Sequence, residues 1–316
     1  MKLLFIIDPI DSFDTQKDST FMMMHAAAKR GWQLVCAEMD DLWVENGQAF
    51  VDSALLTLID DKHNWYDLGE KSSTLLSDFD VVLMRKDPPF DMEYVYATYT
   101  LDLAEKQGVL IVNKPQNIRD ANEKFAITQY PQFAPETLIT RKYARIKDFL
   151  NRHKDIIVKP LDGMGGASIF RIKIGDANTN VILETITKHE TVTVMVQKFE
   201  PAIKDGDKRI LIIDGEPLPY LMARIPAEND GRGNLAAGAE AKIRKLTDQE
   251  YKMAKIIGQD LRQKGALFVG LDVIGDKLTE INNTSPTGIQ HIYKESGVNA
   301  ADILMEAICR RQRERV

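Results

Sequence analysis

Three oxygen-bearing side chains near the C-terminus could bind a divalent cation. Residues 271–282 show the pattern of a β-hairpin and carry Asp272, Glu280 and Asn282. Glu280 and Asn282 lie two apart on a strand, so they share one face. Two adjacent carboxylates and an amide oxygen suit Mg²⁺, or Mn²⁺, bridged to nucleotide phosphates. The alternative is a solvated edge hairpin without a metal.

The length of the turn decides whether the two carboxylates meet. A three-residue loop over residues 275–277 places Asp272 opposite Glu280. A two-residue turn places Asp272 opposite Thr279 and sends Glu280 to the other side. Because only the first register builds a metal site, we expect the three-residue loop.

A glycine-rich loop lies between two strand-like segments in the middle of the chain. Phe170 and Ile172 alternate with charged residues, a strand period, so no helix follows the glycines as a P-loop or dinucleotide fingerprint requires. The loop therefore predicts a flap whose backbone N–H groups contact a phosphate chain, and an ordinary mobile hairpin is the alternative. The candidate phosphate-binding residues of the loop are Gly163, Gly165, Gly166, Ala167 and Ser168.

Two lysines accompany this flap. Lys159 ends the apolar run 156–158, and Lys124 lies near the start of the same region. Lysine side chains are point charges that suit a polyphosphate. A solvated strand or helix end is the alternative for each lysine taken alone.

Four arginines supply candidate carboxylate recognition, because a guanidinium binds a carboxylate through two parallel hydrogen bonds. Arg85, Arg209 and Arg224 flank apolar strand-like runs, and open α/β folds place ligands at strand ends. Arg232 lies in a glycine-rich stretch, 226–242, whose length and lack of periodicity predict either a functional lid or disorder.

Two kinds of domain must position these side chains. Strand-like and helix-like segments alternate up to about residue 120, which predicts an α/β domain with an open parallel sheet and a hairpin at Asn46-Gly47. Antiparallel strand pairs separated by helices follow, an α+β pattern. A capping box, Thr247 to Glu250, opens a helix that ends at Gly265. The expected domains are 1–121, 122–200 and 201–316.

Expected elements of the first part are strands 3–7, 32–37, 80–84 and 109–112, hairpin 42–51, and helices 18–30 and 91–107. Expected elements of the second part are strands 156–159, 168–174 and 191–199, helix 181–189, and hairpins 210–213/217–224 and 267–274/278–281.

Composition excludes several classes of function. The 316 residues include 44% hydrophobic and 28% charged residues, as in globular proteins, and 41 basic against 47 acidic residues give a net charge of −6. Uniform attraction to nucleic acid or to an anionic membrane is therefore not expected. Two cysteines far apart and a first apolar run of five residues fit a cytoplasmic protein without a zinc site, signal peptide or membrane span.

Five blocks of this sequence resemble the bacterial type of glutathione synthetase, an ATP-grasp ligase family, over residues 1 to about 288. The blocks are 84–91 (MRKDPPFD), 158–168 (VKPLDGMGGAS), 203–209 (IKDGDKR), 232–238 (RGNLAAG) and 279–287 (TEINNTSPT). The resemblance implies a two-lobed ATP-grasp fold after the N-terminal domain. It also implies ATP-dependent joining of γ-glutamylcysteine to glycine through an acyl phosphate, giving glutathione, ADP and phosphate.

The resemblance also implies residue roles. Lys124, Lys159 and the flap would bind the phosphates, and Gln197, Lys198 and Phe199 would border the adenine. Asp207 would contribute to the nucleotide and peptide sites, with Arg85 and Arg224 on the peptide. Arg209 would hold the acyl phosphate, the loop around Arg232 would exclude water, and Asp272, Glu280 and Asn282 would hold magnesium.

Two other functions share these nucleotide motifs: another ATP-grasp dipeptide ligase, and a non-catalytic ATP-binding module of the same fold. The resemblance further implies a homo-oligomer, a tetramer or a dimer, with small-molecule substrates and neither nucleic acid nor membrane as partner.

Overall fold

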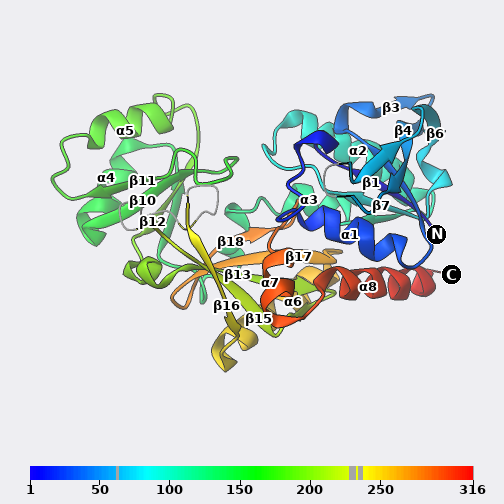
Figure 1. Cartoon of the computed structure of the whole chain (residues 1–316). Coiled ribbons are helices and arrows are strands. Elements are labelled where there is room, and N and C mark those ends of the chain that lie inside the picture. The colour runs from blue at the N-terminus through cyan, green and yellow to red at the C-terminus, as the bar shows by residue number, and fades with distance from the viewer. Residues whose placement is uncertain (62–63, 228–232, 234–237, 316) are drawn as a thin grey trace.

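Three β-sheets organise the chain. The computed structural model describes residues 1–61, 64–227, 233 and 238–315. Figure 1 shows the N-terminal sheet and the sheet of the small lobe on opposite sides above the sheet of the large lobe, from which helices α6, α7 and α8 extend. The α/β class expected from the sequence is confirmed.

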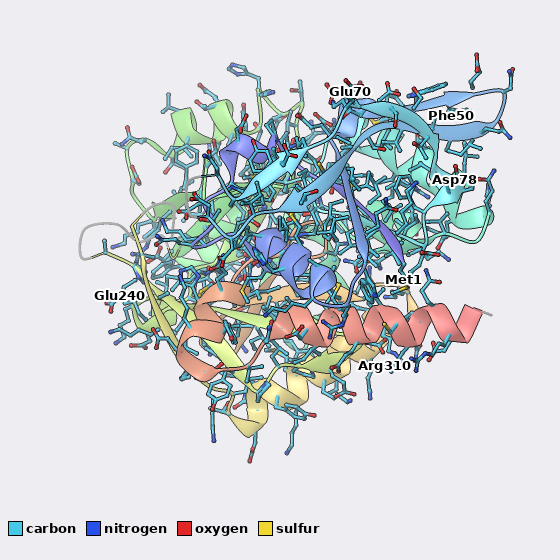
Figure 2. All side chains as sticks on the ribbon, turned by 45° about the vertical axis from the view of Figure 1, so that its right-hand side comes forward. Met1, Phe50, Glu70, Asp78, Glu240 and Arg310 are labelled. Carbon is cyan, nitrogen blue, oxygen red and sulfur yellow. The ribbon has the colours of Figure 1, made fainter. Side chains whose placement is uncertain are left out.

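The N-terminal sheet has four parallel strands, in the order β2-β1-β7-β8 with β8 at one edge, and antiparallel strands beyond β2 at the other edge. The expected open parallel sheet is confirmed, and the predicted hairpin at Asn46-Gly47 lies at its antiparallel edge. Figure 2 shows Phe50 of the edge hairpin at the rim of the molecule, far across the view from Glu240. The strands are β1 (Lys2–Ile6), β2 (Gln33–Ala37), β3 (Leu42–Glu45), β4 (Gln48–Leu58), β5 (Tyr66–Leu68), β6 (Ser72–Leu75), β7 (Val81–Met84) and β8 (Leu110–Val112).

The helices of this domain begin where the sequence places capping residues. The Asp18 carboxylate accepts a hydrogen bond from the N–H of Phe21 (2.8 Å) and opens α1 (Ser19–Ala28). Asp91 caps α2 (Met92–Lys106) in the same way, and α3 (Pro115–Asp120) leads out of the domain. Both faces of the central strands are buried, against α1 on one side and α2 on the other.

The small lobe is a four-stranded antiparallel sheet, ordered β11-β10-β12-β9, with two helices. Ile156, Val158 and Ile172 point into the core that these helices cover. Alternate residues face the opposite way, toward the large lobe. The elements are β9 (Thr137–Thr140), α4 (Tyr143–His153), β10 (Asp155–Pro160), β11 (Phe170–Lys173), α5 (Thr179–Ile186) and β12 (Val194–Lys198).

The large lobe is an antiparallel sheet ordered β16-β15-β13-β17-β18. Helix α6 packs on one face, and the capping box predicted at its start is present. Helix α8 lies beside α1, so one hydrophobic core joins this lobe to the N-terminal domain (Figure 1). The elements are β13 (Asp207–Ile213), β14 (Glu216–Pro217), β15 (Tyr220–Ile225), β16 (Glu240–Lys245), α6 (Asp248–Gln263), β17 (Phe268–Ile274), β18 (Lys277–Asn282), α7 (Ile289–Ser296) and α8 (Ala300–Arg315).

Two predicted segments differ from the structure. The helix expected over 181–189 ends at Ile186, because Lys188, His189 and Glu190 all have positive φ and cannot continue it. The loop expected over 226–242 ends earlier, since Glu240 already begins β16. Residues 228–232 and 234–237 of that loop lie outside the described residues.

The searched part of the chain, which is the described residues, holds no helix whose length and apolar character would let it cross a membrane. The domain boundaries at 121 and 200 stay a prediction.

Candidate active site

A cleft separates the sheets of the small and large lobes and encloses roughly 930 Å³, part of it open to solvent. Twelve of the residues singled out in the sequence line it. They are Lys124, Lys159, Gly163, Gly165, Gly166, Ala167, Gln197, Lys198, Phe199, Asp207, Asp272 and Glu280.

The small lobe contributes one face of its sheet to the cleft. Ile157 pairs with Gln197 across β10 and β12, so these two side chains share a face with Lys159 and Phe199, each two residues further along a strand. Lys159 reaches across the cleft and donates to the Thr279 carbonyl (3.2 Å). Burial lowers the pKa of Lys159, which indicates an ammonium removed from water.

The glycine-rich loop joins β10 to β11 without an intervening helix, as predicted. Gly165 and Gly166 have φ of +65° and +78°, a conformation that side chains rarely adopt. A Cβ at Gly163 would lie 2.9 Å from Cγ of Pro160, so this position needs a glycine for space. Lys124 donates to the Gly163 carbonyl and thereby ties the loop to the start of the lobe.

The hairpin of β17 and β18 places Asp272 opposite Glu280, as expected. The reason given for that register is wrong. Ile274 pairs with Lys277, so the turn has two residues, and a β-bulge at Thr279 adds the residue that restores the alignment. The sequence carried no signal of this bulge.

Asp272 is held by two arginines. Arg209 contacts it through Nε to Oδ1 (2.6 Å) and Nη2 to Oδ2 (3.0 Å), and Arg224 lies 3.0 Å from Oδ2. Burial alone would raise the pKa of Asp272, but the two guanidinium groups outweigh burial and hold that pKa well below its usual range. Asp272 is therefore a carboxylate with fixed position and fixed charge.

Asp207 belongs to the same network and has a spare atom. Its Oδ2 accepts from Nη2 of Arg224 (2.6 Å), while its Oδ1 is buried and has no hydrogen-bond partner among the described residues. Burial raises the pKa of Asp207 to about 6 despite the adjacent Arg224. A buried acceptor without a partner is costly, so this oxygen marks a place where a ligand group fits.

Glu280 faces lysines instead. Lys159 lies 3.3 Å and Lys124 3.8 Å from its Oε1. Burial would raise the pKa of Glu280, but the two lysines lower it below the usual value, and Asp272 is close enough to oppose them. Asp272 and Glu280 are thus neighbouring anions inside the cleft.

Asn282 shares the strand face with Glu280 but is not among the residues that line the cleft. Its amide nitrogen donates to the Gly270 carbonyl (3.2 Å), which leaves its oxygen available. Across the described residues, no three His, Cys, Asp or Glu side chains converge on a metal position. The carboxylates of Asp272 and Glu280 and the amide oxygen of Asn282 are oxygen donors of the kind that Mg²⁺ accepts together with phosphate and water.

Arg85 lies apart from this cleft, at the carboxyl end of β7. Strands β1 and β7 are neighbours in the sheet. The chain leaves β1 toward one face and β7 toward the other, and open α/β sheets bind ligands at such a point. Arg85 donates to Thr20 Oγ1 (3.0 Å) and to the Pro286 carbonyl (3.1 Å), and its Nη1 is buried without a partner. Burial lowers the pKa of Arg85, although Asp18 is close enough to oppose that effect.

Three other predicted residues are described but are not among the residues that line the cleft. Arg209 and Arg224 contact Asp272, which does line it, and Ser168, at φ +57°, lies between the lining residues Ala167 and Ile169. Arg232 lies outside the described residues.

The sequence reasoning missed several residues of the cleft. Glu200 follows the predicted segment directly, and burial raises the pKa of its carboxyl group. The strand periodicity could have found Ile157 and Ile274, because each faces the cleft two residues from a predicted site residue. The other missed lining residues are Pro135, Met164, Ile169, Ile203, Gly233 and Thr279.

Comparison with known families decides the identity of this arrangement. The N-terminal domain of prokaryotic glutathione synthetase matches residues 1–119, and the ATP-grasp domain of prokaryotic glutathione synthetase matches residues 123–297. The chain belongs to the prokaryotic glutathione synthetase family.

Relatives of full length support this membership. The chain is 52% identical over 311 residues to a glutathione synthetase of Vibrio vulnificus (strain YJ016), with 98% of each chain covered. It is also 52% identical over 308 residues to a glutathione synthetase of Escherichia coli O127:H6, again with 98% of each covered. The resemblance inferred from the sequence is confirmed, and the chain is an ATP-dependent ligase that synthesises glutathione.

Solved structures show the fold alone, because their sequences are distant. D-cycloserine synthetase DcsG superposes with a TM-score of 0.70 at 12% identity over 98% of this chain and 99% of that one. A RimK domain protein ATP-grasp from Sphaerobacter thermophilus gives 0.63 at 15% identity over 97% and 99%. The expected ATP-grasp fold is confirmed.

Proposed function

We propose that the chain joins the cysteinyl carboxylate of γ-glutamylcysteine to the amine of glycine, using ATP and passing through an acyl phosphate. The observation that carries this proposal is the group of opposed charges in the cleft: two buried lysines pair with Glu280, which lies opposite the buried Asp272 on the hairpin. Such a group can exchange its internal ion pairs for a triphosphate and a divalent cation.

The phosphate chain lies between the flap and the large lobe. Lys124 and Lys159 release Glu280 and donate to phosphate oxygens, and backbone N–H groups of residues 163–168 complete the cradle. Asp272, Glu280 and Asn282 would hold Mg²⁺, which would supply positive charge to the phosphate chain. The adenine borders the segment 197–199 at the other end of the cleft.

The acyl transfer takes place beside the arginines. The substrate carboxylate attacks the γ-phosphate, ADP leaves, and the resulting acyl phosphate is attacked by the glycine amine with loss of phosphate. Arg209, which Asp272 orients, stabilises the negative charge on the reacting oxygens. Arg224 and Asp207 line the peptide site, and Asp207 also borders the nucleotide. Arg232 belongs to the loop that excludes water.

Arg85 recognises a carboxylate of the peptide. Its unpartnered Nη1 and its burial make it a receptor for an anion, since a guanidinium removed from water gains most from a charged acceptor.

The decisive experiment measures ADP release with ATP and Mg²⁺ while γ-glutamylcysteine and glycine are supplied singly and then together. We expect full release only with both substrates and a peptide yield equal to the ADP released. Release with a different amine, or nucleotide binding without any release, contradicts the proposal.

The cytoplasmic location and the homo-oligomer, tetramer or dimer, stay predictions. Fractionation of cells and light scattering of the purified chain test them.

A further inference from the structure

Arg171 of β11 stacks on the ring of Phe199, a residue that lines the cleft. Its Cζ lies 3.5 Å from the ring centre. The same guanidinium binds Asp155 through two hydrogen bonds, Nε to Oδ1 (2.9 Å) and Nη2 to Oδ2 (2.6 Å). The Asp155 carbonyl also accepts from the Phe199 N–H (3.1 Å). Asp155 and Arg171 thus hold both the ring and the backbone of Phe199.

The sheet register places this contact at the edge of the cleft. Arg171 pairs with Ile157, Asp155 lies two residues before Ile157, and Gln197 pairs with Ile157 from the other side. All of these side chains therefore share the face that looks toward the large lobe. Ile157, Gln197 and Phe199 line the cleft, whereas Asp155 and Arg171 do not. The pair supports the wall from outside.

We propose that Asp155 and Arg171 are positioning residues that fix Phe199 and its neighbours for recognition of the nucleobase. This inference rests on the nucleotide site proposed above. A segment that binds a base edge through backbone groups gains affinity when it is held in its bound position beforehand. The planar fork of arginine suits the task, because it binds a carboxylate and stacks on a ring simultaneously, which an ammonium cannot do.

The inference separates the two ends of the nucleotide. Lys124, Lys159 and the flap serve the phosphate chain, and neither Asp155 nor Arg171 touches them. Loss of the Arg171 contact should therefore weaken ligands that carry a base and spare ligands that consist of phosphates alone.

The experiment compares Arg171→Ala and Arg171→Lys with a matched control, Arg152→Ala. Arg152 stacks on Phe149 in the same lobe (5.4 Å to the ring centre), but Phe149 packs in the core and does not line the cleft. Calorimetry with Mg²⁺ measures the affinity for ADP and for tripolyphosphate, and steady-state kinetics give the KM for ATP and kcat.

We expect Arg171→Ala to weaken ADP binding and raise the KM for ATP about fivefold, the value of a typical cation–π contact. Tripolyphosphate affinity and kcat at saturating ATP stay unchanged, Arg171→Lys resembles Arg171→Ala, and Arg152→Ala resembles the wild type.

Unchanged ADP affinity in Arg171→Ala overturns the inference, and so does equal weakening of tripolyphosphate. Should Arg171→Ala not fold, Asp155→Asn carries the test: it leaves Arg171 able to stack on the ring but removes the carboxylate that fixes the guanidinium, and ADP affinity equal to the wild type overturns the inference. Absence of ADP binding in the wild type instead refutes the nucleotide site itself.

Discussion

Neighbouring residues on β13 enter two networks of similar composition on opposite faces of one strand. Lys208 and Arg244 hold the buried Glu250 at 2.5 and 2.7 Å, on the side of α6. Arg209 and Arg224 hold the buried Asp272 on the side of the cleft. In each network two cations meet one buried carboxylate, and both carboxylates have a lowered pKa.

The two networks differ in whether a buried oxygen beside them is left without a hydrogen-bond partner. Glu250 completes the capping box of α6 by accepting from the Thr247 N–H (2.9 Å), and it lies away from the cleft between the lobes. Asp272 of the inner network and the neighbouring Asp207 line that cleft, and Oδ1 of Asp207 is buried without a partner in the described part of the chain. Ion pairing and a shifted pKa are thus common to scaffold and site. An unpartnered buried atom beside a cleft distinguishes the site.

Replacing one cation in each network should give the largest difference between the two faces of β13. Arg209→Met should lower kcat about 100- to 1,000-fold, because it removes a preorganised donor from the reacting oxygens. Steady-state ADP release measures this effect, and thermal unfolding checks that the variant is folded.

The matched control is the adjacent Lys208→Met, which removes a cation from the outer face. We expect it to reduce the unfolding temperature while kcat stays within about threefold of the wild type. Equal losses of kcat in both variants would contradict the distinction.

Replacing a carboxylate of the cleft, unlike replacing Glu250, should also change how the reaction rate depends on the magnesium concentration. Glu280→Gln removes a charged oxygen from the proposed metal site, so the Mg²⁺ concentration for half-maximal rate should rise roughly 10- to 100-fold. A Mg²⁺ titration of the rate measures the shift. Asp276→Asn, in the exposed turn of the same hairpin, serves as control. A titration curve identical to the wild type would remove Glu280 from the metal site.

The small lobe offers a milder test of the same idea. Lys159→Ala should raise the KM for ATP or lower kcat by about an order of magnitude or more, because charge-assisted hydrogen bonds contribute ~1.5–3 kcal/mol. Lys173→Ala, on the exposed edge strand of the same sheet, should behave like the wild type. Unaltered kinetics in Lys159→Ala would exclude that residue from the phosphate site.

The outer network should reveal itself in the pH dependence of stability. Burial opposes ionisation of Glu250, but hydrogen bonds from Arg244 and Lys208 lower its pKa to about 2. Because the folded pKa lies below the unfolded value, this carboxylate stabilises the fold above pH 4.5, and the stabilisation disappears as the pH falls to about 2.

Glu250→Gln should therefore lower the free energy of unfolding by about 2 kcal/mol at pH 7, and the gap should close toward pH 2. Urea unfolding at several pH values measures the gap. A gap that is constant with pH would show that helix capping, and not charge, is what Glu250 contributes.

Local sequence signals were sufficient for much of the fold. The helix starts near Asp18 and Asp91, the capping box at Thr247 and the hairpin at Asn46-Gly47 all appear where the sequence predicts them. Each depends on dihedral angles or hydrogen bonds within a few residues, so the signal and the structure share the same short segment. The end predicted for the helix at 181–189 was wrong, because no local sequence signal marks the three successive positive φ angles that follow Ile186.

The sequence by itself determined that Glu280 and Asn282 share a strand face and that Lys159 ends a strand beside the glycine-rich loop, while the family resemblance supplied Gln197. Only the tertiary structure decided which positively charged side chain pairs with which carboxylate. Arg209 and Arg224 converge on Asp272 across 63 and 48 positions, Arg171 stacks on Phe199, and a bulge at Thr279 sets the hairpin of β17 and β18 in register. Those choices follow from how sheets pack and align over long separations, and no local preference of the chain encodes them.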